Sequence, residues 1–234
     1  MRRRTPGVVG GELLIEEVIA RAEREDPGRV VRVLEPLVGE RRRARLREVI
    51  ARRLASVSVL FDAPYDPHNG AAVVRSCEAF GVQRLHVVER PGVKFLVARS
   101  VARGAEKWLD VVAYDAPARG IAAARANEAV LVATRADGEL EPADLAKLPR
   151  VALVLGNERD GISDAIAAAC TRSVRVPMRG FVDSLNVSVT CAILLHAATA
   201  GREGDLDDAT KLRLYARGLY FSVPRAAEVL ARAP

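Results

Sequence analysis

Short apolar runs rich in β-branched residues alternate with helical patterns through the middle of the chain, from residue 56 to about residue 200. The runs predict strands at 57–61, 84–88, 111–114, 130–134, 151–155 and 174–176. Helical patterns lie between most of them, notably at 71–80, 116–125 and 163–169. Strands that alternate with helices are joined by crossovers, which predicts an α/β fold, a mostly parallel sheet with helices on both faces.

Two segments of this region have the pattern of deeply buried elements. Residues 151–155 read Val-Ala-Leu-Val-Leu, the continuous apolar character that is typical of a central strand. Residues 185–199 are apolar nearly all round the helical wheel, so we expect a buried helix there.

The two ends of the chain differ from the middle, because charged residues there surround apolar positions at helical spacing. Apolar residues at positions 13, 14, 15, 18 and 19 predict one helix, and residues 40–54 predict a second. Two more helices are expected at 207–216 and at 224–231, with Pro224 in the first turn. We therefore divide the chain into a helical extension at 1–55, an α/β domain at 56–200 and a helical extension at 201–234.

The composition excludes several classes of protein. Half of the 234 residues are apolar and 28% are charged, as in globular and not in disordered chains. No apolar run approaches the roughly 18 residues that a membrane helix needs. The basic first residues are followed by Glu12, Glu16 and Glu17 rather than by an apolar signal core. We expect a cytoplasmic protein with no membrane partner.

The sequence does not indicate metal or nucleoside-triphosphate chemistry. Its three cysteines and three histidines are widely spaced, and no cysteine pair has the Cys-x-x-Cys spacing of a zinc site. The glycine patterns of the P-loop and of the dinucleotide-binding fold are absent. We expect no metal in the functional site.

Positive charge is concentrated in the second helical stretch. The chain carries a net charge of +6, and nearly all its cations are arginines, whose planar groups suit phosphate. Four of them follow one another closely at Arg41, Arg42, Arg43 and Arg45. The run favours a surface that binds the phosphates of a nucleic acid, and the alternative is an ordinary solvated helix face.

Polar and glycine-rich loops follow three of the predicted strands, at the ends where parallel sheets bind ligands. After the first strand come Asn69 and Arg75; taken alone, they could be a helix cap and a surface cation. After the strand at 151–155 comes Gly-Asn-Glu-Arg-Asp-Gly-Ile-Ser, whose glycines Gly156 and Gly161 permit a close backbone approach to a ligand and whose serine can cap the next helix. After 174–176 comes a long loop that contains Ser184, itself a candidate cap, and Asn186.

Together these loops resemble the SpoU (TrmH) class of RNA ribose 2′-O-methyltransferases in the SPOUT superfamily. The first resembles motif 1 of that class through Asn69 and Arg75, although Gly-Ala-Ala follows Asn69 where many members have a Val-Gly or Val-Ser pair. The second resembles motif 2 through Gly156, Glu158 and Gly161, and the third resembles motif 3 through Ser-Leu-Asn-Val-Ser at 184–188. The resemblance covers about residues 56–200, and residues 104–108 and the helical flanks resemble the tRNA-modifying TrmH branch.

The resemblance implies a fold and a set of partners. It implies that the C-terminal part of the α/β domain forms a deep trefoil knot, that S-adenosylmethionine binds in this knot, and that the protein acts as a homodimer with RNA as substrate. The implied substrate is tRNA, methylated on a guanosine of the D-loop. The implied cofactor contacts are Thr134, Leu155, Gly156, Val176, Met178 and Leu185.

The resemblance also assigns catalytic roles, to Arg75, Asn69, Glu158, Ser184 and Asn186. The family gives the activation of the ribose hydroxyl to the arginine of motif 1. Because arginine stays protonated in proteins, we expect Arg75 to stabilise the developing alkoxide while a substrate phosphate or water takes the proton. We expect Asn69 and Glu158 to orient Arg75, and Ser184 and Asn186 to line the pocket.

Three alternatives stay open or are disfavoured. An rRNA substrate fits the same class of enzyme. A non-catalytic RNA-binding protein could keep this fold, but the intact motif residues argue against it. A hydrolase or deaminase is disfavoured because the chain lacks a nucleophile or metal constellation for that chemistry.

Overall fold

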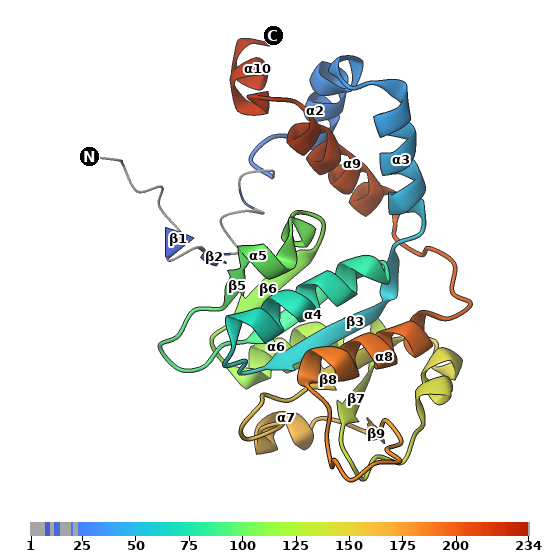
Figure 1. Cartoon of the computed structure of the whole chain (residues 1–234). Coiled ribbons are helices and arrows are strands. Elements are labelled where there is room, and N and C mark those ends of the chain that lie inside the picture. Colours follow the sequence, from blue (N-terminus) through green and yellow to red (C-terminus); the bar gives the residue numbers. More distant parts are fainter. Residues whose placement is uncertain (1–7, 10–11, 15–19, 21–22, 234) are drawn as a thin grey trace.

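The computed structural model describes residues 8–9, 12–14, 20 and 23–233, and a six-stranded parallel sheet lies at its centre (Figure 1). The strand order is β6-β4-β3-β8-β7-β9, and all the pairs are parallel. The strands are β3 (Leu54–Asp62), β4 (Val82–Val88), β6 (Asp110–Tyr114), β7 (Val130–Thr134), β8 (Val151–Leu155) and β9 (Arg172–Val174). The predicted α/β class with a parallel sheet is confirmed.

Helices cover both faces of this sheet (Figure 1). One face carries α4 (Pro67–Ala79) and α8 (Val187–Thr199), and the other carries α6 (Pro117–Ala124) and α7 (Asp164–Ala167). All five residues of β8 are buried, because the strand lies between two neighbours and under helices on both sides. The prediction of a central strand at 151–155 is confirmed.

Helix α8 is less buried than its composition predicts. Leu194 and Leu195 are fully buried, but Val189 is 46% exposed and Ile193 is 36% exposed. The expectation of a helix buried all round was wrong for this face, because the sheet and α4 cover only one side of α8. An apolar strip therefore stays exposed.

Several element boundaries differ from the sequence pattern. Strand β3 begins at Leu54, three residues before the predicted run, because Leu54 pairs with Val82 of β4. Strand β9 ends at Val174, because its pairing with β7 stops at Thr134 and Val174. Residues 175–176, predicted to be in that strand, lie in the loop that follows.

Part of the N-terminal extension lies in a small antiparallel sheet, where the sequence predicted a helix. Strand β1 (Val8–Val9) pairs with β2 (Glu12–Leu14), which pairs with β5 (Leu96–Ala98). Positions 13 and 14 are therefore in a strand, and positions 15, 18 and 19 lie outside the described residues. The helical prediction failed for β2 because its partner is more than 80 residues away in the sequence.

Helices from the N-terminal and C-terminal regions form one helical layer beyond the starts of the strands (Figure 1). Helices α2 (Pro27–Leu34), α3 (Glu40–Ala51), α9 (Asp208–Ser222) and α10 (Ala226–Arg232) share a hydrophobic cluster.

Pro224 lies before α10 and not in its first turn, because Arg225 with φ 55° is the N-cap. The division at residues 55 and 200 stays a prediction. The remaining helical segments are α5 (Arg99–Ala102), η1 (Glu35–Leu37), η2 (Ala105–Lys107), η3 (Ala126–Glu128) and η4 (Pro142–Lys147).

A buried ion network joins this helical layer to the edge of the sheet. Arg217 of α9 is 1% exposed, and its guanidinium donates to Asp110 Oδ1 of β6 at 2.7 Å and to the carbonyl of Leu109 at 3.0 Å. Arg213 donates to Asp110 Oδ2 at 2.5 Å, and Glu23 accepts from both arginines.

Within the described part of the chain, no helix is long and apolar enough to cross a membrane.

Candidate active site

A cleft of about 880 Å³ lies where β7, β8 and β9 end. Three loops line it, at 134–136, 156–162 and 174–190, and they include the second and third motif loops. The cleft is lined by five of the six residues expected to contact the cofactor, Thr134, Gly156, Val176, Met178 and Leu185. Leu155 does not line it, because its side chain is fully buried in the core of the sheet.

Two glycines shape the loop after β8. Gly161 has φ +72°, and a Cβ on Gly156 would lie 2.3 Å from the carbonyl carbon of Gly161. The backbones of Asn157 and Gly161 bond to each other at 2.9 and 3.2 Å, which closes the loop. Only glycine fits this close approach, so the loop is built by the glycines that the sequence singled out.

A buried carboxylate fixes the far end of this loop. Asp62, 2% exposed at the end of β3, accepts a hydrogen bond of 2.7 Å from the backbone N–H of Ser163 through Oδ2. Ser163 is the N-cap residue of α7, but its side chain makes no capping bond. Asp62 was not among the residues predicted from the sequence, although a carboxylate at the end of an otherwise apolar strand was a visible signal.

One chain of hydrogen bonds joins the three motif loops. Asn69 donates from Nδ2 to Glu158 Oε1 at 2.7 Å and accepts at Oδ1 from Asn186 Nδ2 at 3.0 Å. Asn186 Oδ1 accepts from the backbone N–H and the hydroxyl of Ser188 at 2.8 and 2.6 Å. The side chains of motifs 1, 2 and 3 therefore meet at the edge of the cleft.

The helix caps leave the side chains of Asn69 and Ser184 available. Asp66, and not Asn69, is the N-cap of α4, where it accepts from the N–H of His68 at 2.8 Å. Asn186, and not Ser184, is the N-cap of α8. Ser184 is exposed and lines the cleft.

Arg75 does not contact this hydrogen-bonded chain. It is exposed on α4, and among the described residues it forms no hydrogen bond or ion pair. Asn69 and Glu158 bond to each other instead, so the expected orientation of Arg75 by these two side chains is not present in this structure.

Charges on the walls of the cleft are of both signs. The Nε atom of Arg135 lies 2.9 Å from Oδ1 of Asp137, and this ion pair lowers the pKa of the Asp137 carboxyl. The guanidinium of Arg175 lies 3.7 Å from Oε1 of Glu141. The carboxylates of Glu158 and Asp183 also line the cleft. The cleft therefore offers carboxylates to a cationic ligand while its arginines are paired with their own neighbours.

The four predicted RNA-binding arginines lie on α3, in the helical layer, and they are not equivalent. Arg43 pairs with Glu40 at 2.5 Å and Arg45 pairs with Glu48 at 2.9 Å. Arg42 donates to Ser222 Oγ at 3.1 Å and stacks on Trp108 at 5.7 Å from the ring centroid. Arg41 is exposed, without an ion pair to any described residue.

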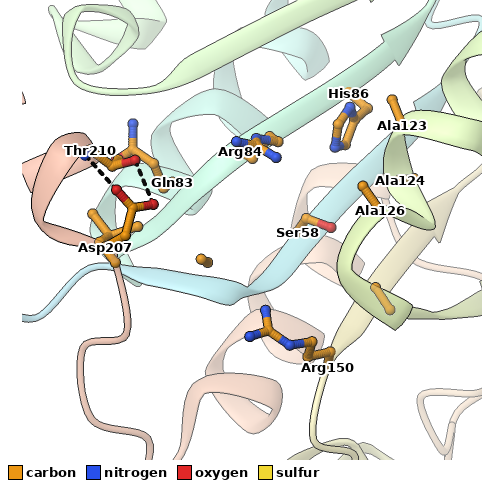
Figure 2. A pocket seen from close by; sticks show the side chains of 13 residues that line it. Ser58, Gln83, Arg84, His86, Ala123, Ala124, Ala126, Arg150, Asp207 and Thr210 are labelled. Carbon is orange, nitrogen blue, oxygen red and sulfur yellow. Dashed lines mark hydrogen bonds between the residues drawn. The ribbon is translucent and has the colours of Figure 1, made fainter. Parts of the chain in front are cut away.

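A second, smaller hollow of about 80 Å³ lies where β3, β4 and β8 begin (Figure 2). The cleft described above lies at the other ends of the strands. Ser58, Arg84, His86 and Arg150 line it, and none belongs to the three motif loops. Burial and the nearby charge of Arg84 lower the pKa of His86 to about 4, so this imidazole is neutral at pH 7. Across the residues that the structure describes, no group of three or more His, Cys, Asp or Glu side chains could hold a metal ion.

A stack of three side chains beside the motif loops was also not predicted from the sequence. The guanidinium of Arg90 lies 4.1 Å, and that of Arg159 lies 4.4 Å, from the ring centroid of Tyr65. Arg159 follows Glu158 in motif 2, but nothing local in the sequence indicates that it meets residues 65 and 90.

Comparisons with known proteins agree with the geometry. The model of the SpoU rRNA Methylase family matches residues 56–196. A tRNA (guanosine(18)-2′-O)-methyltransferase of Aquifex aeolicus is 35% identical over 174 residues, which is 73% of this chain and 82% of that protein.

Solved structures give the same result. The crystal structure of the A. aeolicus TrmH/SpoU tRNA modifying enzyme matches with a TM-score of 0.70 and 29% identity, over 80% of this chain and 98% of that one. The SpoU methyltransferase AviRb from Streptomyces viridochromogenes, solved with AdoMet, matches with a TM-score of 0.55 and 28% identity, over 66% of this chain and 62% of that one. With its three motif loops joined at one cleft, this chain belongs to the SpoU methylase family.

Proposed function

We propose that this protein is an S-adenosylmethionine-dependent RNA 2′-O-ribose methyltransferase that acts on a guanosine in the D-loop of tRNA. The observation that carries the proposal is the hydrogen-bonded chain from Glu158 through Asn69 to Asn186 at the edge of the cleft. It places the polar groups of all three motifs next to a hollow large enough for a nucleoside-sized cofactor.

The cleft fits S-adenosylmethionine in size and in chemistry. Its volume of about 880 Å³ is within the range of small-molecule sites. Val176, Met178 and Leu185 provide apolar walls for an adenine ring. The carboxylates of Glu158 and Asp183 complement a cationic ligand. When bound, the cofactor supplies an electrophilic methyl group on a positively charged sulfur.

The protein's own residues would then position the ribose and handle its proton. Arg75 has no carboxylate partner among the described residues, so its guanidinium is available to stabilise a developing alkoxide on the 2′-oxygen. It stays protonated, and the proton of the hydroxyl passes to a substrate phosphate or to water. Asn69 and Asn186 hold the edge of the pocket, and Ser184 lines it.

A homodimer is part of this proposal. Phe181 is fully exposed, and Val182, Val189, Met178 and Ile193 are between 36% and 60% exposed on the same loop and on α8. Such a group of large apolar side chains is typical of a protein interface. Light scattering that gives twice the chain mass at micromolar concentration would support the dimer, and a monomer mass would contradict it.

The trefoil knot is a further part of the proposal. The chain leaves β9 at one edge of the sheet and returns to α8, which packs beside α4. The connecting residues line the same cleft as the loops after β7 and β8, which is the arrangement that a chain threaded past those loops requires. A knotted path would hold the cofactor loops together without a ligand.

The choice of tRNA rests on the name of the Aquifex relative and on the basic surface of α3. An rRNA substrate is the alternative, since the matching family is described by rRNA methylation. The cytoplasmic location expected from the sequence belongs to the same proposal.

The test of the proposed function is transfer of a labelled methyl group from S-adenosylmethionine to a tRNA transcript or to an rRNA fragment by the purified protein. Transfer to tRNA alone supports the proposal, and transfer to rRNA alone would replace its substrate.

A further inference from the structure

We propose that Arg90, Tyr65 and Arg159 form a binding site for a backbone phosphate of the RNA, next to the nucleotide that is methylated. This site, which we call the arginine stack, rests on the proposed function above. It would fix the register of the substrate strand at the cleft.

The arginine stack leaves little room for a base on the Tyr65 ring. Strand β3 lies between β4 and β8, so Tyr65, which follows β3, has the loop after β4 with Arg90 and the loop after β8 with Arg159 as its neighbours. Their guanidinium carbons lie 4.1 and 4.4 Å from the ring centroid, which is the distance of direct stacking. Two guanidinium groups this close to one ring compete with an RNA base for the same ring, so the stack is a poor platform for base stacking.

The edges of the two guanidinium groups keep unused donors. Arg90 donates from Nε to the carbonyl of Pro64 at 3.2 Å, and this is the only hydrogen bond of its guanidinium to a described residue. The side chain of Arg159 makes none to the described residues. Each guanidinium carries five N–H donors, so most of the donors of the pair remain free for an anion.

The neighbouring carboxylates do not neutralise the pair by direct ion pairing. Asp160 accepts from the Tyr65 hydroxyl at 3.3 Å, and Glu158 accepts from the Tyr65 N–H at 3.2 Å and from Asn69. Glu89 accepts from Lys94 at 3.2 Å and from the N–H of Phe95 at 2.7 Å. Two stacked cations that pair with no carboxylate of the described residues favour a phosphate, whose oxygens match the guanidinium edges.

The location of the stack identifies the source of that phosphate. Glu158 links the backbone of Tyr65 directly to Asn69, so the stack lies one hydrogen bond away from the chain that joins the motifs. A phosphate held here belongs to the strand that carries the reacting ribose. Binding of this phosphate would fix the orientation of the 2′-hydroxyl relative to the cofactor. Small errors in the orientation of a reacting group lower the rate of the chemical step strongly.

The test compares variants in single-turnover methylation of a tRNA transcript. We expect Arg90→Ala and Arg159→Ala to lower the rate constant at saturating cofactor by about tenfold or more. Tyr65→Leu removes the ring and should lower the rate constant by a similar factor. Tyr65→Phe keeps the stacking faces, so its rate constant should be close to that of the wild type. The affinity for S-adenosylmethionine should change less than twofold in all four. Arg150→Ala is the matched control, because it removes the same charge at the opposite edge of the sheet.

Modified RNA shows whether the ligand is a backbone phosphate. One uncharged methylphosphonate, placed on either side of the target nucleotide, should slow the wild type at one of the two positions. The same modification should slow Arg159→Ala much less, because the two changes remove one interaction. If methylphosphonate has no effect and inorganic phosphate inhibits only the wild type, the site takes free phosphate and the RNA assignment is overturned.

Two further outcomes are distinguishable. Variants as active as the wild type on unmodified tRNA would overturn the arginine stack and leave the proposed function intact. A wild type that binds S-adenosylmethionine but methylates no RNA would overturn the proposed function itself, and this proposal with it.

Discussion

The amide of Asn69 donates a 2.7 Å hydrogen bond to the carboxylate of Glu158, although 88 residues separate the two positions in the sequence. Asn69 lies in the first turn of α4 and Glu158 lies in the glycine loop after β8. The parallel sheet brings these places together, because β3 and β8 are neighbours and their C-terminal ends meet at one edge. This contact is the link between motif 1 and motif 2.

Asn69→Ala should reduce methyl transfer by disconnecting the motifs. We expect a loss of about 1–2 kcal/mol, or roughly 5- to 30-fold in rate, because the Glu158 carboxylate loses a charge-assisted hydrogen bond at the site. The measurement is a double-mutant cycle with Glu158→Gln in single-turnover assays. If the effects of the two changes simply add, the hydrogen bond does not contribute to catalysis.

Arg75→Ala should nearly abolish methyl transfer and leave cofactor affinity close to that of the wild type. A positioned charge at a developing oxyanion contributes on the order of 3–4 kcal/mol, about 10²–10³ in rate. Cofactor affinity should persist because Arg75 does not line the cleft. Turnover measured beside isothermal titration with S-adenosylmethionine separates the two effects, and near-normal turnover would show that Arg75 is only a surface cation.

Gly156→Ala should weaken the binding of S-adenosylmethionine. The added Cβ would lie 2.3 Å from the carbonyl carbon of Gly161, so the loop that lines the cleft must open. Titration calorimetry should show at least about a tenfold loss of affinity, since more than 1.4 kcal/mol of strain is expected from such a contact. The matched control is Gly92→Ala in an exposed turn, where a Cβ meets no atom within 4 Å although φ is +73°. Equal affinity in Gly156→Ala and wild type would contradict the assigned cofactor cleft.

The sequence predicted the sheet and the motif loops because their signals are local. Each strand is a short apolar run, and each motif loop directly follows a strand. The strand β2 was missed because its pairing with β5 joins Leu13 to Val97, and no local pattern contains that contact. The capping residue of α4 was misread although the signal was present, since Pro67 suits the first helical position and therefore points to Asp66.

The arginine stack and the exposed face of α8 could not be predicted from the sequence. Residues 65, 90 and 159 follow three different strands, and only the order of those strands places them together. The composition of α8 is apolar on all sides, so its pattern does not show which side the sheet leaves uncovered. Both features depend on the assembled fold and not on any one segment.

The ion network at Asp110 should make stability depend on pH in the acid range. Burial raises the pKa of Asp110, but hydrogen bonds and charges from Arg213 and Arg217 outweigh it and lower the pKa to about 2. Because the folded-state value lies below the unfolded value of 3.8, the contribution is present above pH 3.8 and is lost as pH falls toward 2. The shift corresponds to about 2 kcal/mol.

Urea unfolding of the wild type and of Asp110→Asn between pH 6 and pH 2 measures this contribution. The difference in unfolding free energy should be large near neutral pH, because the variant removes one of the two carboxylates that pair with the buried Arg217 and leaves only Glu23. It should shrink by about 2 kcal/mol as the pH falls. A difference that is constant over this range would show that Asp110 does not titrate with folding.

Replacement of Arg41, Arg42, Arg43 and Arg45 by alanine should weaken RNA binding regardless of sequence and flatten its dependence on salt. Each phosphate contact that is lost should reduce the slope of log K against log salt by about 0.7–0.9. Because Arg43 and Arg45 already pair with Glu40 and Glu48, Arg41→Ala alone should account for a large share of the effect. Filter binding at several salt concentrations measures the slope, and cofactor titration is the control. An unchanged slope would mean that α3 is a solvated face.

The most direct test of the proposed reaction is a map of ribose methylation in tRNA, read by mass spectrometry at nucleotide resolution. The purified protein, a D-loop-containing tRNA transcript and S-adenosylmethionine should yield one 2′-O-methylated guanosine in the D-loop, and the product should disappear when Arg75 is replaced by alanine. Transcripts that stay unmodified with a protein that binds the cofactor, or that carry the methyl group on a base, would contradict the assignment of this chain as a tRNA ribose methyltransferase.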